Sequence, residues 1–356
     1  MFEYKPDFEK VLDRYEAWWD AQIPLVSIAF AKPAEEQIPY PPAKDHPTLR
    51  DRWLDTEYLV ENTRARMANI HFFADALPTV FPNLGPEIYS AFYGCPLEFS
   101  ENTSWSVPIL DSWDQAAVDA LKLDTENFYF RKLEEMTDAL IDIGKGKFIV
   151  GYTDIHPGGD GIAAFRDPQE FCFDMLEHPA EVKALVDRVT DDFFQVYDHF
   201  YDKLSAAGMP STSWLSATCK GKYHIPSNDF SCMVSDEMFA DLFLPGIAKE
   251  CAHMDRCIYH LDGPQALRFL DPLLDIPDLH AVQWVAGANY DYWGDWIEVY
   301  QHIQERGKSF CLGVPLKDLD KLFQALKPEG CWVSVGGVTD QETAEEVVKA
   351  IERWGR

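Results

Sequence analysis

The chain has 356 residues, of which 47% are hydrophobic and 14% aromatic, so it holds enough apolar surface for a large core or a wide aromatic pocket. Sixty acidic residues against 31 basic ones give a formal charge of −29, which repels phosphate backbones and anionic lipids. This charge argues against nucleic acid, a membrane surface or a substrate with many carboxylates as a partner.

The N-terminal segment, residues 1–22, is amphipathic and charged, unlike a signal peptide. The chain contains no run of about 18 apolar residues, so we expect no membrane span. Its eight cysteines are scattered and form no Cys-x-x-Cys pair. These features predict a cytoplasmic protein with reduced thiols.

Short apolar and β-branched runs predict eight strands, separated in most cases by helical patterns. The strands are 24–30, 75–81, 148–154, 211–218, 257–262, 279–286, 309–314 and 331–336. The helices between and after them include 179–203, 235–255, 293–306, 316–326 and 341–354. This alternation predicts a single α/β domain over 1–356, a (β/α)8 TIM barrel with N-terminal helices. Residues 82–147 are long for one connection, and we expect them to form a turn-rich excursion over one end of the barrel.

Polar side chains follow the predicted strands at their carboxyl ends, where the active sites of such barrels lie. They are Asp154 and His156 after the third strand, Lys222, His224 and Asp229 after the fourth, and His260 and Asp262 on the fifth. We expect Asp154, His156, Asp229 and His260 to be catalytic residues. Lys222 and His224 are candidates for binding an anionic substrate group, although a solvated loop explains them equally well. Trp105 and Trp284 are candidates for an aromatic substrate wall, which core packing also explains.

His260 and Asp262 stand two residues apart and therefore point to the same face of their strand. Three interpretations stay open for this pair. The side chains are ligands of a metal, or a carboxylate that orients an imidazole for acid–base chemistry, or a buried hydrogen bond that closes the strand.

Three segments carry a resemblance to a known family. They read "YTDIHPGGDG", "YHIPSNDFSCMVSDEMFADLFLP" and "YHLDGPQALRFLDPLL", in this order, within a match that runs from about residue 55 to the C-terminus. The chain resembles the uroporphyrinogen decarboxylase superfamily, and the resemblance implies a (β/α)8 barrel. It also implies either porphyrinogen decarboxylation or methyl transfer linked to a corrinoid, with zinc as the activating metal.

The decarboxylase branch fits this sequence poorly. That branch has an arginine-rich segment after its first strand, which holds the carboxylates of the substrate. Here the segment reads "IAFAKPAEEQIPYPP" and contains no arginine. In the methyltransferase branch, His260 matches the first zinc ligand, Asp262 replaces the first cysteine, and Gly336 or Gly337 falls near the second.

We therefore expect a methyltransferase that moves a methyl group between a small methylated substrate and a corrinoid carried by a separate protein. The resemblance implies zinc on His260 and Asp262. Two alternatives stay open: a metal-free lyase or decarboxylase acting on a small non-porphyrin substrate, and a ligand-binding barrel without catalysis.

Overall fold

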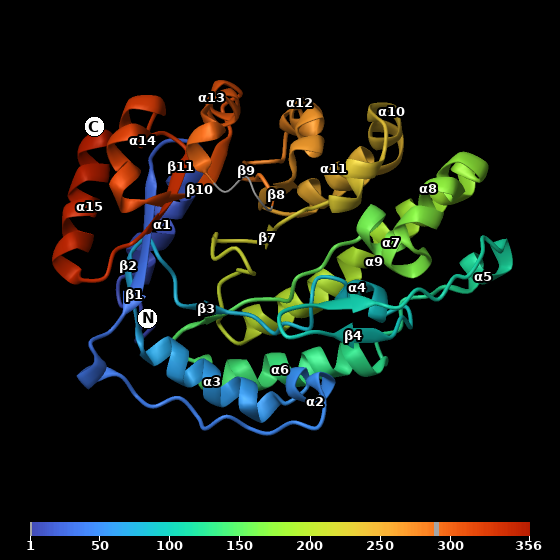
Figure 1. The fold of residues 1–356 in the computed structure, drawn as a ribbon, viewed down its shortest axis with the longest axis horizontal. Helices are drawn as coiled ribbons and strands as arrows, with labels where there is room; N and C mark the ends of the chain where they lie inside the picture. The colour runs from blue at the N-terminus through green and yellow to red at the C-terminus, as the bar shows by residue number, and fades with distance from the viewer. Residues whose placement is uncertain (1, 288–291) are drawn as a thin grey trace.

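A mostly parallel sheet of seven strands forms the centre of the computed structural model, which describes residues 2–287 and 292–356 (Figure 1). Its strands are β1 (Leu25–Ala31), β2 (Ile70–Ala74), β7 (Tyr223–His224), β8 (Arg256–Asp262), β9 (Ala281–Val285), β10 (Ser309–Pro315) and β11 (Cys331–Gly336). They are ordered β2-β1-β11-β10-β9-β8-β7, and only the β1–β2 pair is antiparallel. The fold is therefore α/β with a parallel core, as the alternating pattern predicts.

Two short sheets complete the strand content of the described residues. β3 (Thr79–Val80) pairs in parallel with β6 (Ile149–Val150), and β4 (Leu97–Phe99) pairs antiparallel with β5 (Ser104–Ser106). Single hydrogen bonds connect the β3–β6 pair to its surroundings. Before β3, the Asp75 amide donates to the Val26 carbonyl of β1 (2.8 Å), and after β6, the Tyr152 amide donates to the Thr212 carbonyl (3.1 Å).

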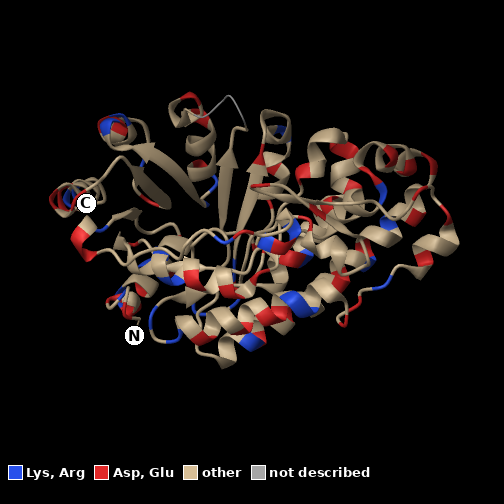
Figure 2. Ribbon diagram, turned by 60° about the horizontal axis from the view of Figure 1, so that its bottom comes forward, with Lys and Arg blue, Asp and Glu red and all other residues tan. Residues whose placement is uncertain are grey.

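The helices lie mainly around the outside of these strands (Figure 1). They are α1 (Phe8–Trp19), α2 (Leu49–Trp53), α3 (Thr56–Ala68), α4 (Ile88–Ala91), α5 (Gln115–Ala120), α6 (Phe128–Gly144), α7 (Gly158–Arg166), α8 (Pro168–Glu177), α9 (Pro179–Ala206), α10 (Asp236–Met238), α11 (Leu244–His253), α12 (Leu270–Leu274), α13 (Ile297–Glu305), α14 (Leu319–Ala325) and α15 (Gln341–Trp354). Figure 2 shows that acidic and basic residues gather on these helices, whereas the strands of the large sheet carry few of them. No helix within the described residues is long and apolar enough to cross a membrane.

Most predicted strands are present in the structure. Those at 24–30, 257–262, 279–286, 309–314 and 331–336 correspond to β1, β8, β9, β10 and β11. The strands predicted at 75–81 and 148–154 are reduced to the two-residue β3 and β6. β2 and β7 are strands that the sequence analysis did not predict.

The strand predicted at 211–218 is wrong, because this segment forms only an isolated bridge between Ser211 and Cys219. Its residues instead make individual bonds to the end of β6. The Ser213 hydroxyl donates to the Tyr152 carbonyl (3.1 Å), and a Cβ at Gly151 would overlap the Thr212 carbonyl oxygen. Because the backbones touch so closely and the following residues turn away, no ladder of paired residues extends along the segment.

The excursion at 82–147 is more regular than the turn-rich segment we expected. It contains α4, the β4–β5 hairpin, α5 and the 17-residue helix α6. Asn127 caps α6 by accepting the Tyr129 amide at 2.8 Å. The buried face of α6 carries apolar residues at helical spacing, including Leu133, Met136 and Leu140.

Candidate active site

Three side chains from two segments meet at the carboxyl end of β8. Asp229, His260 and Asp262 each present a ligand atom, and these atoms lie within 4.8 Å of one another. His260 and Asp262 come from alternate positions of β8, as the spacing of two predicts. Asp229 is the first residue of a short 3₁₀ helix, Asp229–Met233. The structure thus brings together three of the residues that the sequence singles out.

Backbone pairing places the Asp229 loop beside β8. The His260 amide donates to the Pro226 carbonyl (2.9 Å), and Ser227 forms a parallel bridge with His260. Asp160, near the start of α7, then accepts the amides of Asp229 (3.0 Å) and Phe230 (2.7 Å). Because four amides at a helix start lack partners within the helix, a carboxylate at this place fixes the position of the loop.

The imidazole of His260 is oriented by its neighbour on β9. Gln283 lies directly opposite His260 in the β8–β9 register, and its Oε1 is 2.6 Å from Nδ1. An amide oxygen only accepts, so Nδ1 is the donor in this bond and Nε2 is the nitrogen left for a ligand. This arrangement is the one in which a metal-binding histidine donates its second nitrogen to a protein acceptor.

The carboxylate of Asp262 lies close to that of Asp229, and one of its oxygens lacks a hydrogen-bond partner among the described residues. Its Oδ1 is buried and has no hydrogen-bond partner among the described residues. Burial and repulsion from Asp229 raise the pKa of Asp262, although His260 opposes the shift. Two carboxylates this close repel each other, and a cation between them would remove the repulsion.

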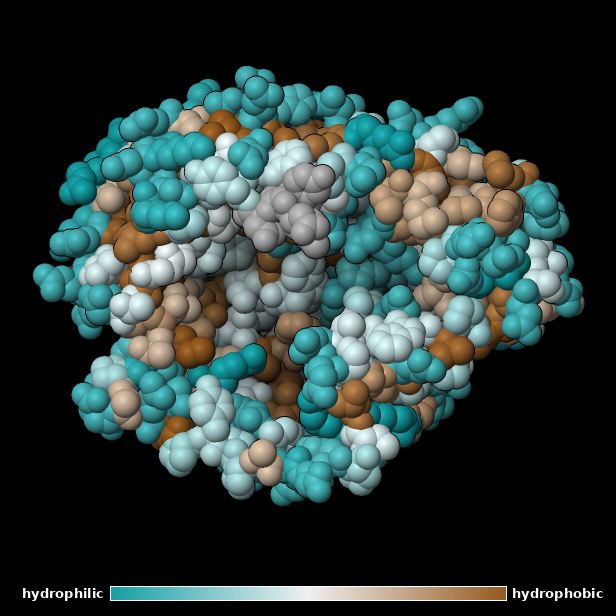
Figure 3. Space-filling model, in the orientation of Figure 1, coloured by the Kyte–Doolittle hydropathy of each residue, from teal (hydrophilic) through white to brown (hydrophobic). Residues whose placement is uncertain are grey.

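Two cavities adjoin the three-residue cluster. Asp262 and Gln283 line a cavity of about 930 Å³ whose walls include five tryptophans. Figure 3 shows the molecular face hollowed at its centre, with apolar and weakly polar residues inside the hollow. Asp229 lines a second cavity of about 400 Å³, together with His156, Asp160 and Trp105. The cluster therefore exposes one carboxylate to each cavity.

Asp154 and His156 form an ion pair beside this cluster. His156 Nε2 is 2.9 Å from Asp154 Oδ1. Burial disfavours charge on the imidazole, but the carboxylates of Asp154, Asp160 and Asp229 outweigh it and raise the pKa of His156 to about 10. His156 is therefore a charged imidazolium at neutral pH.

Asp160 is a site residue that the sequence analysis missed. Burial and repulsion from Asp229 raise its pKa to about 6, although His156 and the two amides it accepts oppose the shift. The glycines around it in "HPGGDG" are the available signal, because they let the backbone pass close to the Asn228 side chain at Gly159. The sequence analysis also missed Gln283. The available signal was the pairing of the predicted strands 257–262 and 279–286, which places Gln283 beside His260.

Lys222 and His224 do not reach the cluster, and neither lines the two cavities. Lys222 pairs with Asp198 at 2.6 Å. His224 is buried between the Tyr152 hydroxyl (2.9 Å) and Glu250 (3.0 Å). Burial lowers the pKa of His224 and raises that of Glu250, so it disfavours the charged form of both partners.

The two tryptophans predicted as a substrate wall lie on different cavities. Trp284 is 5% exposed and lines the large cavity. Trp105 is 42% exposed and lines the small one. Each wall therefore includes one of the predicted aromatic side chains.

Residues 154–159 have the spacing Asp-x-His-x-x-Gly, which is that of a cobalamin-binding signature. In this chain, His156 Nε2 is engaged by Asp154, and its Nδ1 is buried without a hydrogen-bond partner in the described parts of the chain. Asp154 therefore holds His156 Nε2 in this structure, and His156 lines the small cavity.

No family model matches this chain, and no curated protein matches it in sequence. The resemblance to the uroporphyrinogen decarboxylase superfamily therefore stays a prediction from the sequence motifs. Among solved structures, the chain is similar to a methyltransferase from Methanosarcina mazei, with a TM-score of 0.59 and 9% sequence identity. The similarity covers 97% of this chain and 98% of the other, so the two share a fold over their whole length.

Proposed function

We propose that this protein is a methyltransferase that moves a methyl group between a small methylated substrate and a corrinoid on a separate protein. The observation that carries the proposal is the Asp229–His260–Asp262 cluster, whose Asp262 lines a large cavity with several tryptophans in its wall. The full-length similarity in fold to a methyltransferase supports it. We also infer that the parallel strands form a (β/α)8 barrel, in which the cluster occupies the usual place of an active site.

Zinc fits the three side chains of the cluster. Catalytic zinc sites use three protein ligands from histidine and carboxylates and leave a fourth position open. The cluster offers one imidazole nitrogen and two carboxylate groups, and the Oδ1 of Asp262 has no partner among the described residues. Zinc held there by Asp229, His260 and Asp262 would act as a Lewis acid on the heteroatom that carries the methyl group.

Neighbouring residues orient the proposed ligands and exchange protons. Gln283 holds the His260 ring in one tautomer, and Asp160 fixes the Asp229 loop. Breaking the bond between the methyl carbon and its heteroatom leaves a basic atom that must take up a proton. Asp160, with a pKa of about 6, accepts the Asp229 amide and would exchange that proton at neutral pH.

A metal-free lyase or decarboxylase is the second candidate. The charged His156 and the weakly acidic Asp160 in the small cavity favour it, because decarboxylation needs positive charge that stabilises the carbanion left on carbon when carbon dioxide departs, and a proton donor to that carbanion. The metal content of the protein separates the two candidates.

The first experiment measures metal by plasma mass spectrometry on untagged protein purified without chelator. We expect about one zinc per chain, as the three-ligand cluster implies. Zinc should be lost in Asp229→Asn, His260→Ala and Asp262→Asn, and kept in Asp320→Asn, an exposed aspartate on α14. Zinc-loaded protein should then demethylate methylcobalamin in the presence of a thiol or amine acceptor.

A parent protein that stays free of metal after dialysis against zinc would overturn the zinc-assisted mechanism. Carboxylate ligands would then be screened for loss of carbon dioxide, with Asp160→Asn as the variant that should abolish activity.

A further inference from the structure

The large cavity is lined by only two charged side chains among the described residues, and they belong to distant elements. Arg66 comes from the last turn of α3 and Asp262 from the end of β8. Figure 1 shows α3 at the lower edge of the molecule and β8 above its centre. The cavity therefore has a cationic end at Arg66 and an anionic end at the three-residue cluster.

Arg66 has no ion-pair partner among the described residues. Its guanidinium makes no hydrogen bond or ion pair with any described residue, and Arg66 is exposed to solvent at the mouth of the cavity that it lines. About half of the 31 lysines and arginines form an ion pair with an acidic residue in the described parts of the chain, and Arg66 is not among them. In a chain with a formal charge of −29, an arginine left unpaired at a cavity is an available site for an anionic group of a ligand.

Aromatic side chains form much of the wall between the two charged ends. They include Trp214, Trp284, Trp293, Trp296 and Trp332. Trp284 and Trp293 are each 5% exposed, and their indole N–H groups have no acceptor among the described residues. Indole rings bind flat rings by stacking or edge contacts, and unpaired N–H donors favour a ligand with oxygen acceptors.

We propose that this cavity binds a planar aromatic molecule with a single anionic group, which lies at Arg66 while the opposite end of the ring faces Asp262. The inference rests on the proposed function in that it names the substrate class of the same site. One arginine balances one negative charge, so a polycarboxylate would leave uncompensated charge against an acidic protein. A volume of about 930 Å³ accommodates one or two fused rings.

A quaternary ammonium ion is the competing ligand class, because indole faces and Asp262 attract cations. Such a ligand carries no acceptor for the two indole N–H groups, and Arg66 would repel it. The observations therefore favour the aromatic anion, and the experiment below also measures whether a quaternary ammonium ion binds.

The test is isothermal titration calorimetry of chelator-treated protein with 2-naphthoate, 2-naphthamide, tetramethylammonium and a tricarboxylate. We expect 2-naphthoate to bind with one molecule per chain and at least tenfold more tightly than the amide. Arg66→Gln should weaken 2-naphthoate at least tenfold and leave the amide unchanged, and Arg66→Lys should restore part of the loss. Arg64→Gln is the matched control, since Arg64 is an exposed residue of the same helix that does not line the cavity.

Equal affinity for acid and amide, no effect of Arg66→Gln, tighter binding of tetramethylammonium, or no heat with any ligand would each overturn the proposal. Circular dichroism of every variant verifies that it is folded. Because binding is measured without metal or corrinoid, a protein that binds 2-naphthoate and transfers no methyl group contradicts the proposed function alone.

Discussion

At the scale of single residues, the site is defined by charges that the protein holds close together. Asp229 repels both Asp160 and Asp262 and thereby raises the pKa of each, beyond the effect of burial. His156 is the one cation in this group, and the same carboxylates keep it protonated. Such concentrations of perturbed groups are typical of functional sites, although structural ion pairs also produce them.

We predict that Asp154→Asn lowers the pKa of His156 from about 10, as measured by NMR of the imidazole resonances. A pKa raised by folding stabilises the protein fully below the unfolded value of about 6.5 and loses that contribution as the pH rises through about 10. Asp154→Asn should therefore lower the free energy of unfolding at neutral pH. The stabilisation that protonated His156 still provides in the variant should disappear at a lower pH than in the parent protein. Asp320→Asn should leave the titration unchanged, and an unaltered pKa in Asp154→Asn would contradict the prediction.

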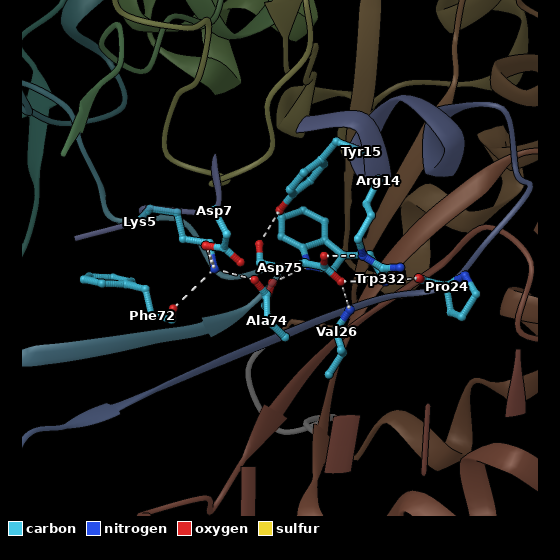
Figure 4. Close-up of polar contacts among 11 residues, drawn as sticks. Lys5, Asp7, Arg14, Tyr15, Pro24, Val26, Phe72, Ala74, Asp75 and Trp332 are labelled. Carbon is cyan, nitrogen blue, oxygen red and sulfur yellow. Dashed lines mark hydrogen bonds and ion pairs between the residues drawn. The ribbon is translucent and has the colours of Figure 1, made fainter. Parts of the chain in front are cut away.

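At the scale of elements, an ion pair between a buried aspartate and a partly exposed arginine fastens the N-terminal helix to the sheet. Asp75 is 1% exposed and accepts from Arg14 of α1 through both oxygens (2.6 and 2.9 Å). It also accepts the Val26 amide of β1 at 2.8 Å, as Figure 4 shows. One side chain thus joins α1, β1 and the segment before β3.

We predict that Asp75→Asn lowers the free energy of unfolding by roughly 2–4 kcal/mol, measured by urea denaturation. The loss arises because the amide replaces two charge-assisted bonds and leaves the Arg14 guanidinium without its counter-charge. The control is Asp13→Asn, whose exposed pair with Lys220 should contribute less than about 1 kcal/mol. Equal effects of the two variants would show that the buried pair does not fasten the helix.

Close backbone contact replaces strand pairing between β6 and residues 211–213. We predict that Gly151→Ala destabilises the protein by about 1–3 kcal/mol, because its Cβ would overlap the Thr212 carbonyl. Gly336→Ala is the matched control, because a Cβ there meets no atom within 4 Å. Thermal unfolding of both variants tests the prediction, and a neutral Gly151→Ala would mean that the two backbones separate at little cost.

At the scale of the whole molecule, the acidic surface sets the response to salt. With a formal charge of −29, repulsion between surface carboxylates opposes the folded state. Raising NaCl from about 0.01 M to about 1 M shortens the Debye length from about 30 Å to about 3 Å. We therefore predict that the urea concentration at the midpoint of unfolding rises with the NaCl concentration. KCl is the control and should have the same effect. A midpoint that falls with salt would show that attraction within surface ion pairs outweighs the repulsion.

The sequence by itself determined the α/β class of the fold and the placement of two site residues, His260 and Asp262. Apolar runs of six to eight residues separated by helical patterns predicted β1, β8, β9, β10 and β11, because strand and helix periods are local properties. The same period of two placed His260 and Asp262 on one face of β8. Neither conclusion needed a contact between distant segments.

Only the tertiary structure decided which distant residues join that pair. Asp229 reaches the cluster through the bridge between Ser227 and His260, and Gln283 reaches it through the β8–β9 register. Lys222 and His224 are close to Asp229 in the sequence, yet the backbone turns their side chains toward Asp198 and Glu250. Local patterns fix the face of a strand, whereas the distances between side chains of separate segments depend on strand register and loop path, which are set by packing across the whole fold.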